Sequence, residues 1–303
     1  MAKKEKLLRL EPASPLRYPG GKALLTAYVS GVIEENFLVG STFYEPYAGG
    51  ASVSLELLRL GFIADAVLVE RDPLIYAFWW CVIHETDALC SMIEKCRVTI
   101  ETWWDLQPTR LIDNPTACDF TVSELGFAGL FFNRTNFSGI LGAGPIGGKE
   151  QSSEYKIDCR FNKEKIIRQI KAVATFSDRL SINFGDAIKF LQKNAEQVSN
   201  GFSFVYIDPP YYLQGKKLYR HSYSDGDHVA LAEFIRKQGY PWVLSYDDHP
   251  RIRDLYSDNE IQPIYLDYKV KSNRTAQELV ISNLVIPPPV YEGSKKQELI
   301  ALL

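Results

Sequence analysis

The sequence contains no long hydrophobic run: no stretch approaches the roughly 18 consecutive apolar residues that a membrane-spanning helix needs. Its basic N-terminus also lacks the apolar segment and small-residue cleavage site of a secretion signal. The five cysteines are an odd number with no Cys-x-x-Cys pair, which indicates neither a disulfide framework nor a zinc site. The four histidines show no metal-ligand spacing. We therefore expect a cytoplasmic protein with no membrane segment and no bound metal.

A strong excess of charge of one sign is also missing, because 34 Lys and Arg residues stand against 37 Asp and Glu residues. This balance argues mildly against a nucleic-acid partner, whose phosphates are bound by Lys and Arg. A local patch decides the matter, however, and residues 131–179 hold nine Lys and Arg against five Asp and Glu. A second basic cluster comprises Lys216, Lys217, Arg220 and His221. Either cluster could contact nucleic acid or form an ordinary solvated surface.

Length and composition fit one large soluble domain, or one domain that carries a substantial insertion. The 303 residues are 46% hydrophobic and 23% charged, with no internal repeat. Short apolar segments bounded by turn residues predict strands at 42–47, 66–69, 180–184, 202–207 and 242–245. Helical patterns separate these segments, which predicts a parallel α/β sheet. Between them we expect an irregular stretch over 86–161 and a helix from Asn162 to about Phe176.

Acidic residues stand at the ends of four expected strands: Glu45, Glu70, Asp186 and Asp208. Ligands of parallel α/β sheets bind beyond the carboxyl ends of the strands. These four carboxylates therefore indicate a binding site at that edge of the sheet.

The most specific motif, Asp208-Pro209-Pro210-Tyr211, follows an apolar strand. An exocyclic amino group of a base is a poor nucleophile, because its lone pair is delocalised into the ring. A carboxylate and a backbone carbonyl can accept its two N–H bonds and free the lone pair, while the prolines stiffen the turn. The tyrosine ring can stack on the base, which is worth about 1–3 kcal/mol. The alternative is a turn after a core strand, with the aspartate as a cap.

Four weaker motifs suit a ligand that carries a nucleoside. A glycine-rich turn follows the first strand in Glu45-Pro46-Tyr47-Ala48-Gly49-Gly50, without the spacing of a dinucleotide site or a P-loop. An acid about 20 residues later commonly bonds ribose hydroxyls, and Glu70 and Asp72 compete for that role. Asp186 suits either a base amino group or a helix cap. Arg17-Tyr18-Pro19-Gly20-Gly21-Lys22 suits an anionic ligand, although a plain loop would look similar.

Together and in this order, the motifs resemble the Dam-type (alpha class) adenine-specific DNA N6-methyltransferases, from Arg17 to about Asn283. RYPGGK, FYEPYAGGAS, GDA and DPPY are similar to the family's two cofactor motifs, its cofactor-adenine acid and its catalytic tetrapeptide. FNRTNFSGI and SYDDHPRIRDLY are similar to a segment before the target-reading region and to a late motif. The sequence departs from the pattern at Ala51, where a third glycine is common, and at Glu70, where Asp is more usual.

The resemblance implies a Rossmann-like methyltransferase sheet (1–73 and 179–303) with a mostly helical target-recognition insertion (74–178). It implies transfer of a methyl group from S-adenosylmethionine to adenine N6 in double-stranded DNA, with the base flipped out of the duplex. The residues expected to bind the cofactor are Tyr18, Pro19, Gly20, Gly21, Lys22, Glu45, Pro46, Tyr47, Ala48, Gly49, Gly50, Glu70, Arg71, Asp186 and Ala187. The residues expected to hold and activate the adenine are Asp208, Pro209, Pro210 and Tyr211.

Arg134 and Asn136 are the expected contacts to DNA, because Arg and Asn suit guanine and adenine edges. The alternative is that Asn133 and Arg134 brace the fold. Two other readings of the whole chain stay open: a methyltransferase for N4 of cytosine or for RNA, and a non-catalytic relative that binds nucleic acid. The expected location is the cytoplasm of a prokaryotic or phage-infected cell. The sequence does not say whether a partner restriction endonuclease exists.

Overall fold

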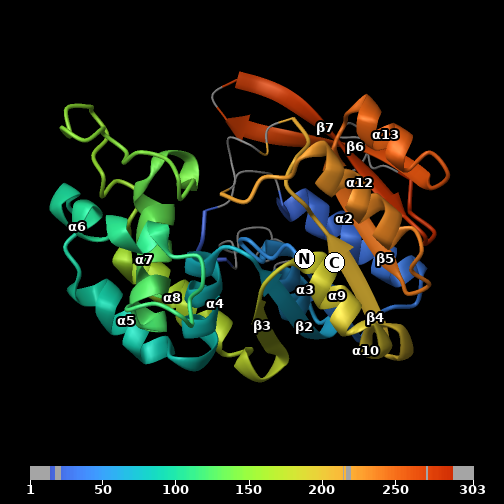
Figure 1. Ribbon diagram of the computed structural model, residues 1–303, viewed down its shortest axis with the longest axis horizontal. Helices are drawn as coiled ribbons and strands as arrows, with labels where there is room; N and C mark the ends of the chain where they lie inside the picture. Colours follow the sequence, from blue (N-terminus) through green and yellow to red (C-terminus); the bar gives the residue numbers. More distant parts are fainter. Residues whose placement is uncertain (1–13, 18–21, 214, 216–219, 271, 289–303) are drawn as a thin grey trace, which may run out of the picture.

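A computed structural model describes residues 14–17, 22–213, 215, 220–270 and 272–288, which form a seven-stranded sheet in the order β3-β2-β1-β4-β5-β7-β6 (Figure 1). Strands β1 to β5 run parallel, whereas β7 is antiparallel to both β5 and β6. The fold is α/β, as the sequence predicts. The strands are β1 (Ser41–Glu45), β2 (Ile63–Glu70), β3 (Leu180–Phe184), β4 (Ser203–Ile207), β5 (Trp242–Asp247), β6 (Glu260–Val270) and β7 (Ser272–Ser282).

Helices cover both faces of the sheet, because alternate residues of the central strands point to opposite sides. Phe43 and Phe204 pack in one apolar cluster with α2 and α3, whereas Tyr44 and Val205 pack in a second cluster with helices of the other face. On the first side lie α2 (Lys22–Glu35) and α3 (Ser52–Leu60). On the second lie α9 (Ala187–Lys193), α10 (Ala195–Asn200), α12 (Asp225–Ile235) and α13 (Pro250–Leu255).

A group of helices extends beyond the β3 edge of the sheet (Figure 1). It comprises α4 (Pro73–His84), α5 (Thr86–Lys95), α6 (Ile100–Asp105), η1 (Gln107–Leu111), α7 (Val122–Thr135), η2 (Phe137–Gly139), α8 (Lys163–Ala174) and η3 (Ser177–Arg179). The expectation of an irregular stretch over 86–161 is therefore wrong for α5, α6 and α7. The expected helix from Asn162 is α8, with Asn162 as its N-cap.

The sequence of α7 shows no helical alternation of apolar and polar residues, because the helix is buried on almost all sides. Every residue from Leu125 to Asn133 is buried, so no polar face alternates with an apolar one. The start of α7 nevertheless has a sequence signal, because Thr121 and Glu124 form a capping box.

Two glycines let α7 lie against the backbone of α4. A Cβ atom on Gly126 would lie 2.8 Å from the Ala77 carbonyl oxygen, and one on Gly129 would lie 2.5 Å from that of Leu74. One apolar cluster thus runs from sheet residue Leu68 through α4 into Phe131 of α7. Because α4 begins directly after β2, the helical group is fixed relative to the carboxyl ends of the strands.

Neither the hairpin of β6 and β7 nor the long helix α2 is predicted from the sequence. In the described part of the chain, no helix has both the length and the apolar character needed to cross a membrane.

Candidate active site

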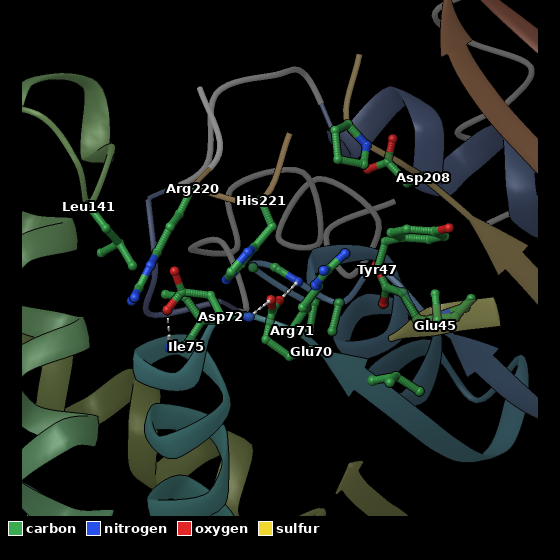
Figure 2. Close-up of a pocket in the computed structure, with 18 of the residues that line it drawn as sticks. Glu45, Tyr47, Glu70, Arg71, Asp72, Ile75, Leu141, Asp208, Arg220 and His221 are labelled. Atoms are coloured by element: carbon green, nitrogen blue, oxygen red, sulfur yellow. Dashed lines mark hydrogen bonds between the residues drawn. The ribbon is translucent and has the colours of Figure 1, made fainter. Parts of the chain in front are cut away.

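A pocket opens at the carboxyl ends of β1 to β4 (Figure 2). Glu45, Glu70, Asp186 and Asp208 all line it. Residues about 160 positions apart in the sequence meet here because parallel strands end at one edge. Of the other expected cofactor and catalytic residues, the pocket lining includes Pro46, Tyr47, Ala48, Gly49, Gly50, Arg71, Ala187, Pro210 and Tyr211.

The glycine-rich turn is held in shape by Glu70. One carboxylate oxygen accepts a hydrogen bond from Gly49 N at 2.8 Å, and the other accepts one from Asp72 N at 2.8 Å (Figure 2). Trp79 Nε1 donates to the Gly49 carbonyl at 2.8 Å. Ala51 adopts φ 48°, so it takes the left-handed conformation that a glycine would favour.

Burial dominates the electrostatics of Glu70. It raises the pKa of this carboxyl group from 4.5 to about 7, although the backbone hydrogen bonds from Asp72 and Gly49 oppose the shift. Burial also raises the pKa of Asp72, against the opposing effect of the Arg220 guanidinium. Asp72 caps α4 by accepting from Leu74 N at 2.9 Å, which leaves Glu70 as the strand-end acid nearer the glycine turn.

Glu45 and Asp186 differ in their partners. Glu45 is 3% exposed and binds the backbone N and the hydroxyl of Ser54 in α3, so it ties the turn to the helix that follows. Asp186 caps α9 by accepting from Lys189 N at 3.1 Å and lies 3.6 Å from Arg71 Nη1. Asp186 therefore combines the cap and pocket positions that the sequence offered as alternatives.

Asp208 directly follows β4 and is oriented by its neighbours. Its Oδ1 accepts a hydrogen bond from Ser245 Oγ at 2.9 Å, and Ser245 Oγ lies 3.1 Å from the Tyr206 hydroxyl. Tyr211 donates its hydroxyl to Glu278 Oε1 at 2.7 Å. The turn thus presents a carboxylate and an aromatic ring at the pocket, each oriented by a hydrogen bond, and such groups can hold an amino-bearing base.

The segment after Asp-Pro-Pro-Tyr contributes site residues that sequence reasoning missed. Arg220, His221 and Tyr223 line the pocket, and Figure 2 shows Arg220 and His221 directed toward Asp72. The hydroxyl groups of Tyr223 and Tyr47 lie 2.6 Å apart. The only sequence signal was the basic cluster that includes Arg220 and His221, for which contact with nucleic acid and a solvated surface were both open. Arg220 also pairs with Asp113 of the helical group at 2.7 Å.

Arg17, the first residue of the N-terminal motif, lines the pocket and is bound by Asn133 of α7. Asn133 Oδ1 accepts from Arg17 N at 2.6 Å, and Asn133 Nδ2 donates to the carbonyls of Arg17 and Gly139 at 2.8 and 3.0 Å. The expected residues Tyr18, Pro19, Gly20 and Gly21 lie outside the described residues, as does the side chain of Lys22, whose backbone begins α2.

The structure gives Arg134 and Asn136 internal partners. Asn136 is fully buried: its Oδ1 accepts from Trp103 Nε1 at 2.7 Å, and its Nδ2 donates to the carbonyls of Ile140 and Leu141. Arg134 Nη2 donates to the Pro15 carbonyl, and burial lowers the pKa of Arg134 to about 10. We therefore assign Asn136 to the fold rather than to a base edge, and Arg134 braces the N-terminal segment.

Comparison with known proteins gives the family. No curated protein sequence matches the chain. The model of the D12 class N6 adenine-specific DNA methyltransferases matches residues 18–272, more than four fifths of the chain. The match includes the glycine turn, Glu70, Asp186 and the Asp-Pro-Pro-Tyr turn, and the seven-stranded sheet is consistent with an S-adenosylmethionine-dependent methyltransferase. The chain therefore belongs to the D12 class of N6 adenine-specific DNA methyltransferases and is an enzyme that methylates adenine in DNA.

Proposed function

We propose that this enzyme is a Dam-type, alpha-class methyltransferase that acts at specific sites in double-stranded DNA and flips its target adenine into the pocket. The observation that carries this proposal is that Asp208 lines the same pocket as Glu70 and Asp186. An adenine stacked inside the duplex cannot bring N6 to a carboxylate that lines a pocket, so the base must leave the stack.

The test is to incubate the enzyme with S-adenosylmethionine and genomic DNA, then to identify the modified nucleoside and its sequence context. N6-methyladenine at one short recurring site is expected. Methylation of adenine without site preference, or faster methylation of single-stranded DNA or RNA of the same sequence, would contradict the proposal.

The residues present fit S-adenosylmethionine, the cofactor of methyltransferases of this type, which supplies the methyl group. Gly49 adopts φ 46° and brings backbone close to the cavity. Glu70 lies where ribose hydroxyls would donate, and Asp186 lies where a base amino group would donate. His221 Nε2 is buried without a hydrogen-bond partner in the described part of the chain, which marks unused bonding capacity at the pocket wall. Tyr18 to Lys22 remain proposed contacts for the cofactor carboxylate.

The raised pKa of Glu70 predicts that cofactor affinity depends on pH. Ribose hydroxyls donate to the ionised carboxylate, and with a pKa of about 7 that form becomes dominant only as the pH rises past neutrality. The affinity for S-adenosylhomocysteine should therefore increase by about fivefold to tenfold between about pH 6 and about pH 8. Calorimetric titration across this range measures the effect.

Glu70→Gln is the matched control, because glutamine keeps an acceptor oxygen but does not titrate. The variant should show a flatter profile than the wild type, whereas titration of the ligand's own amino group would affect both proteins equally. Parallel profiles for the two proteins would remove Glu70 from the ribose site.

We also propose that the basic segment 131–179 contacts DNA through its exposed part rather than through Arg134 and Asn136. Lys149 is exposed and lies 5.0 Å from the ring centroid of Trp104, which is 47% exposed. Gly139 to Gly142, earlier in the same segment, line the pocket. The segment thus connects the pocket to a surface with an exposed cation and an aromatic ring, which suit the backbone and the bases of a nucleic acid.

Lys149→Ala should weaken DNA binding to all sequences alike and reduce the slope of log affinity against log salt by about 1. Fluorescence anisotropy at several salt concentrations measures this. Lys193→Ala, at the end of α9 that points away from the pocket, is the control and should leave the slope unchanged. An unchanged slope in Lys149→Ala would contradict the phosphate contact.

A cytoplasmic location, with the DNA substrate, is part of the same proposal. A partner endonuclease is not part of it.

A further inference from the structure

Two carboxylates on neighbouring strands accept hydrogen bonds from Tyr211, Tyr212 and Leu213. These residues end the segment from Asp208 to Leu213, which we call the catalytic turn. Asp247, the last residue of β5, accepts from Tyr212 N at 2.8 Å and from Leu213 N at 3.0 Å. Glu278 of β7 accepts the Tyr211 hydroxyl at 2.7 Å. In the antiparallel register of β5 and β7, Asp247 and Glu278 are directly opposite each other, so both side chains point to the same face of the sheet.

The stability of the sheet alone does not explain why Asp247 and Glu278 stand opposite each other. Like charges directly opposite each other on antiparallel strands are destabilising, and Glu278 is only 4% exposed. A carboxylate is rarely placed in such surroundings unless hydrogen-bond donors satisfy it. The Tyr211 hydroxyl is such a donor, and the 2.7 Å distance fits a charge-assisted O–H···O bond.

The strand that carries Glu278 is itself rigidly attached. Ser282 of β7 donates its hydroxyl to the Trp242 carbonyl of β5 at 2.6 Å, and Leu279 and Ile281 are fully buried. A one-residue slip would move these apolar side chains to the wrong face. The position of Glu278 relative to the catalytic turn is therefore fixed by the register of the sheet, although 67 residues separate it from Tyr211.

We propose that Glu278 is a positioning residue for methyl transfer, which fixes the orientation of the Tyr211 ring so that the flipped adenine stacks with N6 at Asp208. The proposal rests on the proposed role of Tyr211 as the surface on which the base stacks. An aromatic ring rotates about two side-chain bonds, and the hydroxyl bond to Glu278 restricts both. Misplacement of a reacting group by about 1 Å can cost up to a hundredfold in rate.

The test is a double-mutant cycle on single-turnover methylation of duplex DNA carrying the enzyme's own site, at saturating S-adenosylmethionine and DNA. Tyr211→Phe and Glu278→Ala should each lower the rate about tenfold. The double variant should be no slower than the slower single variant, because both changes break the same bond. Glu278→Gln should stay close to wild type, since its side-chain carbonyl can still accept the hydroxyl. Gln277→Ala, the adjacent residue of β7, is the control and should be unaffected.

A second readout separates orientation from stability. With 2-aminopurine in place of the target adenine, the fluorescence of the enzyme-bound duplex reports how the extrahelical base stacks. Tyr211→Phe and Glu278→Ala should change it in the same direction, whereas a loss of folded protein would only reduce the bound fraction. If Glu278→Ala does not fold, Glu278→Asp takes its place in the cycle, because the shorter side chain draws the acceptor away from the Tyr211 hydroxyl while the charge is kept.

The failures of the two proposals are distinguishable. If Tyr211→Ala reacts at the wild-type rate, the stacking role of Tyr211 is wrong. If Tyr211→Ala is slow but Tyr211→Phe reacts at the wild-type rate, or if the effects of Tyr211→Phe and Glu278→Ala multiply in the double variant, only the role of Glu278 is overturned.

Discussion

Replacing Asp208 with alanine is expected to slow methyl transfer by on the order of a hundredfold to a thousandfold while the protein stays folded and binds cofactor. The carboxylate accepts N–H bonds of the adenine amino group as positive charge develops on N6, so its contribution is realised mainly in the transition state. Its orientation is set in advance by the hydrogen bond from Ser245 Oγ at 2.9 Å.

The measurement is the single-turnover rate of folded Asp208→Ala on an adenine-containing duplex at saturating S-adenosylmethionine. Ser245→Ala keeps the carboxylate but removes the donor that orients it, and should lower the rate by about tenfold. Tyr211→Ala should be milder than Asp208→Ala if the ring only holds the base, and Tyr211→Phe should be milder than Tyr211→Ala.

The competing view of Asp208 makes a different prediction. As a simple turn cap, its removal would lower the free energy of unfolding by about 1 kcal/mol and leave the folded fraction active. A rate near wild type in folded Asp208→Ala would therefore overturn the catalytic assignment.

The parallel half of the sheet could be predicted because its signals are local. Each of its strands is a short apolar run followed by an acid, a glycine or a proline, and β1, β2, β3 and β4 lie at or within a few residues of the expected positions. Acidic residues at the carboxyl ends of parallel strands lie at the same edge of the sheet. Predicting the parallel sheet therefore also predicts the position of the pocket.

The antiparallel hairpin could not be predicted in the same way. Pro263 lies inside β6, and a proline argues against a central strand. The structure places β6 at the edge of the sheet, where a missing N–H donor is tolerated. Because β7 is not predicted from the sequence, the contact between Glu278 and the catalytic turn could not be predicted either.

The contacts between distant segments were equally inaccessible. Asn133 holds Arg17 across 116 residues, and Arg220 pairs with Asp113 across 107 residues. The residue types suggested base contacts for Arg134 and Asn136, whereas the structure gives both side chains internal partners. Side-chain chemistry alone does not separate these roles, because the same groups bond equally well to a base edge and to a backbone.

Removing Asn133 should have the second-largest effect of a single substitution, on both stability and cofactor binding. Its side chain makes three hydrogen bonds and is 1% exposed, and Asn133→Ala would leave an N–H and two carbonyls of Arg17 and Gly139 without these partners. Unsatisfied buried groups cost about 1–3 kcal/mol each, with partial relaxation, so a loss of about 3 kcal/mol is expected.

Asn133→Ala should also lower the affinity for the cofactor, because Arg17 directly precedes residues Tyr18 to Lys22, which are proposed to hold the cofactor. Gly139 is part of the same contact: a Cβ atom there would lie 2.7 Å from the Arg17 carbonyl oxygen. Chemical denaturation measures the stability, and titration with S-adenosylhomocysteine at a temperature where the variant is folded measures the affinity, which should fall at least tenfold. Asn162→Ala is the matched control, since it removes the cap of α8, costs about 1 kcal/mol, and should leave the affinity unchanged. Wild-type affinity in folded Asn133→Ala would show that Asn133 stabilises the fold without supporting the cofactor motif.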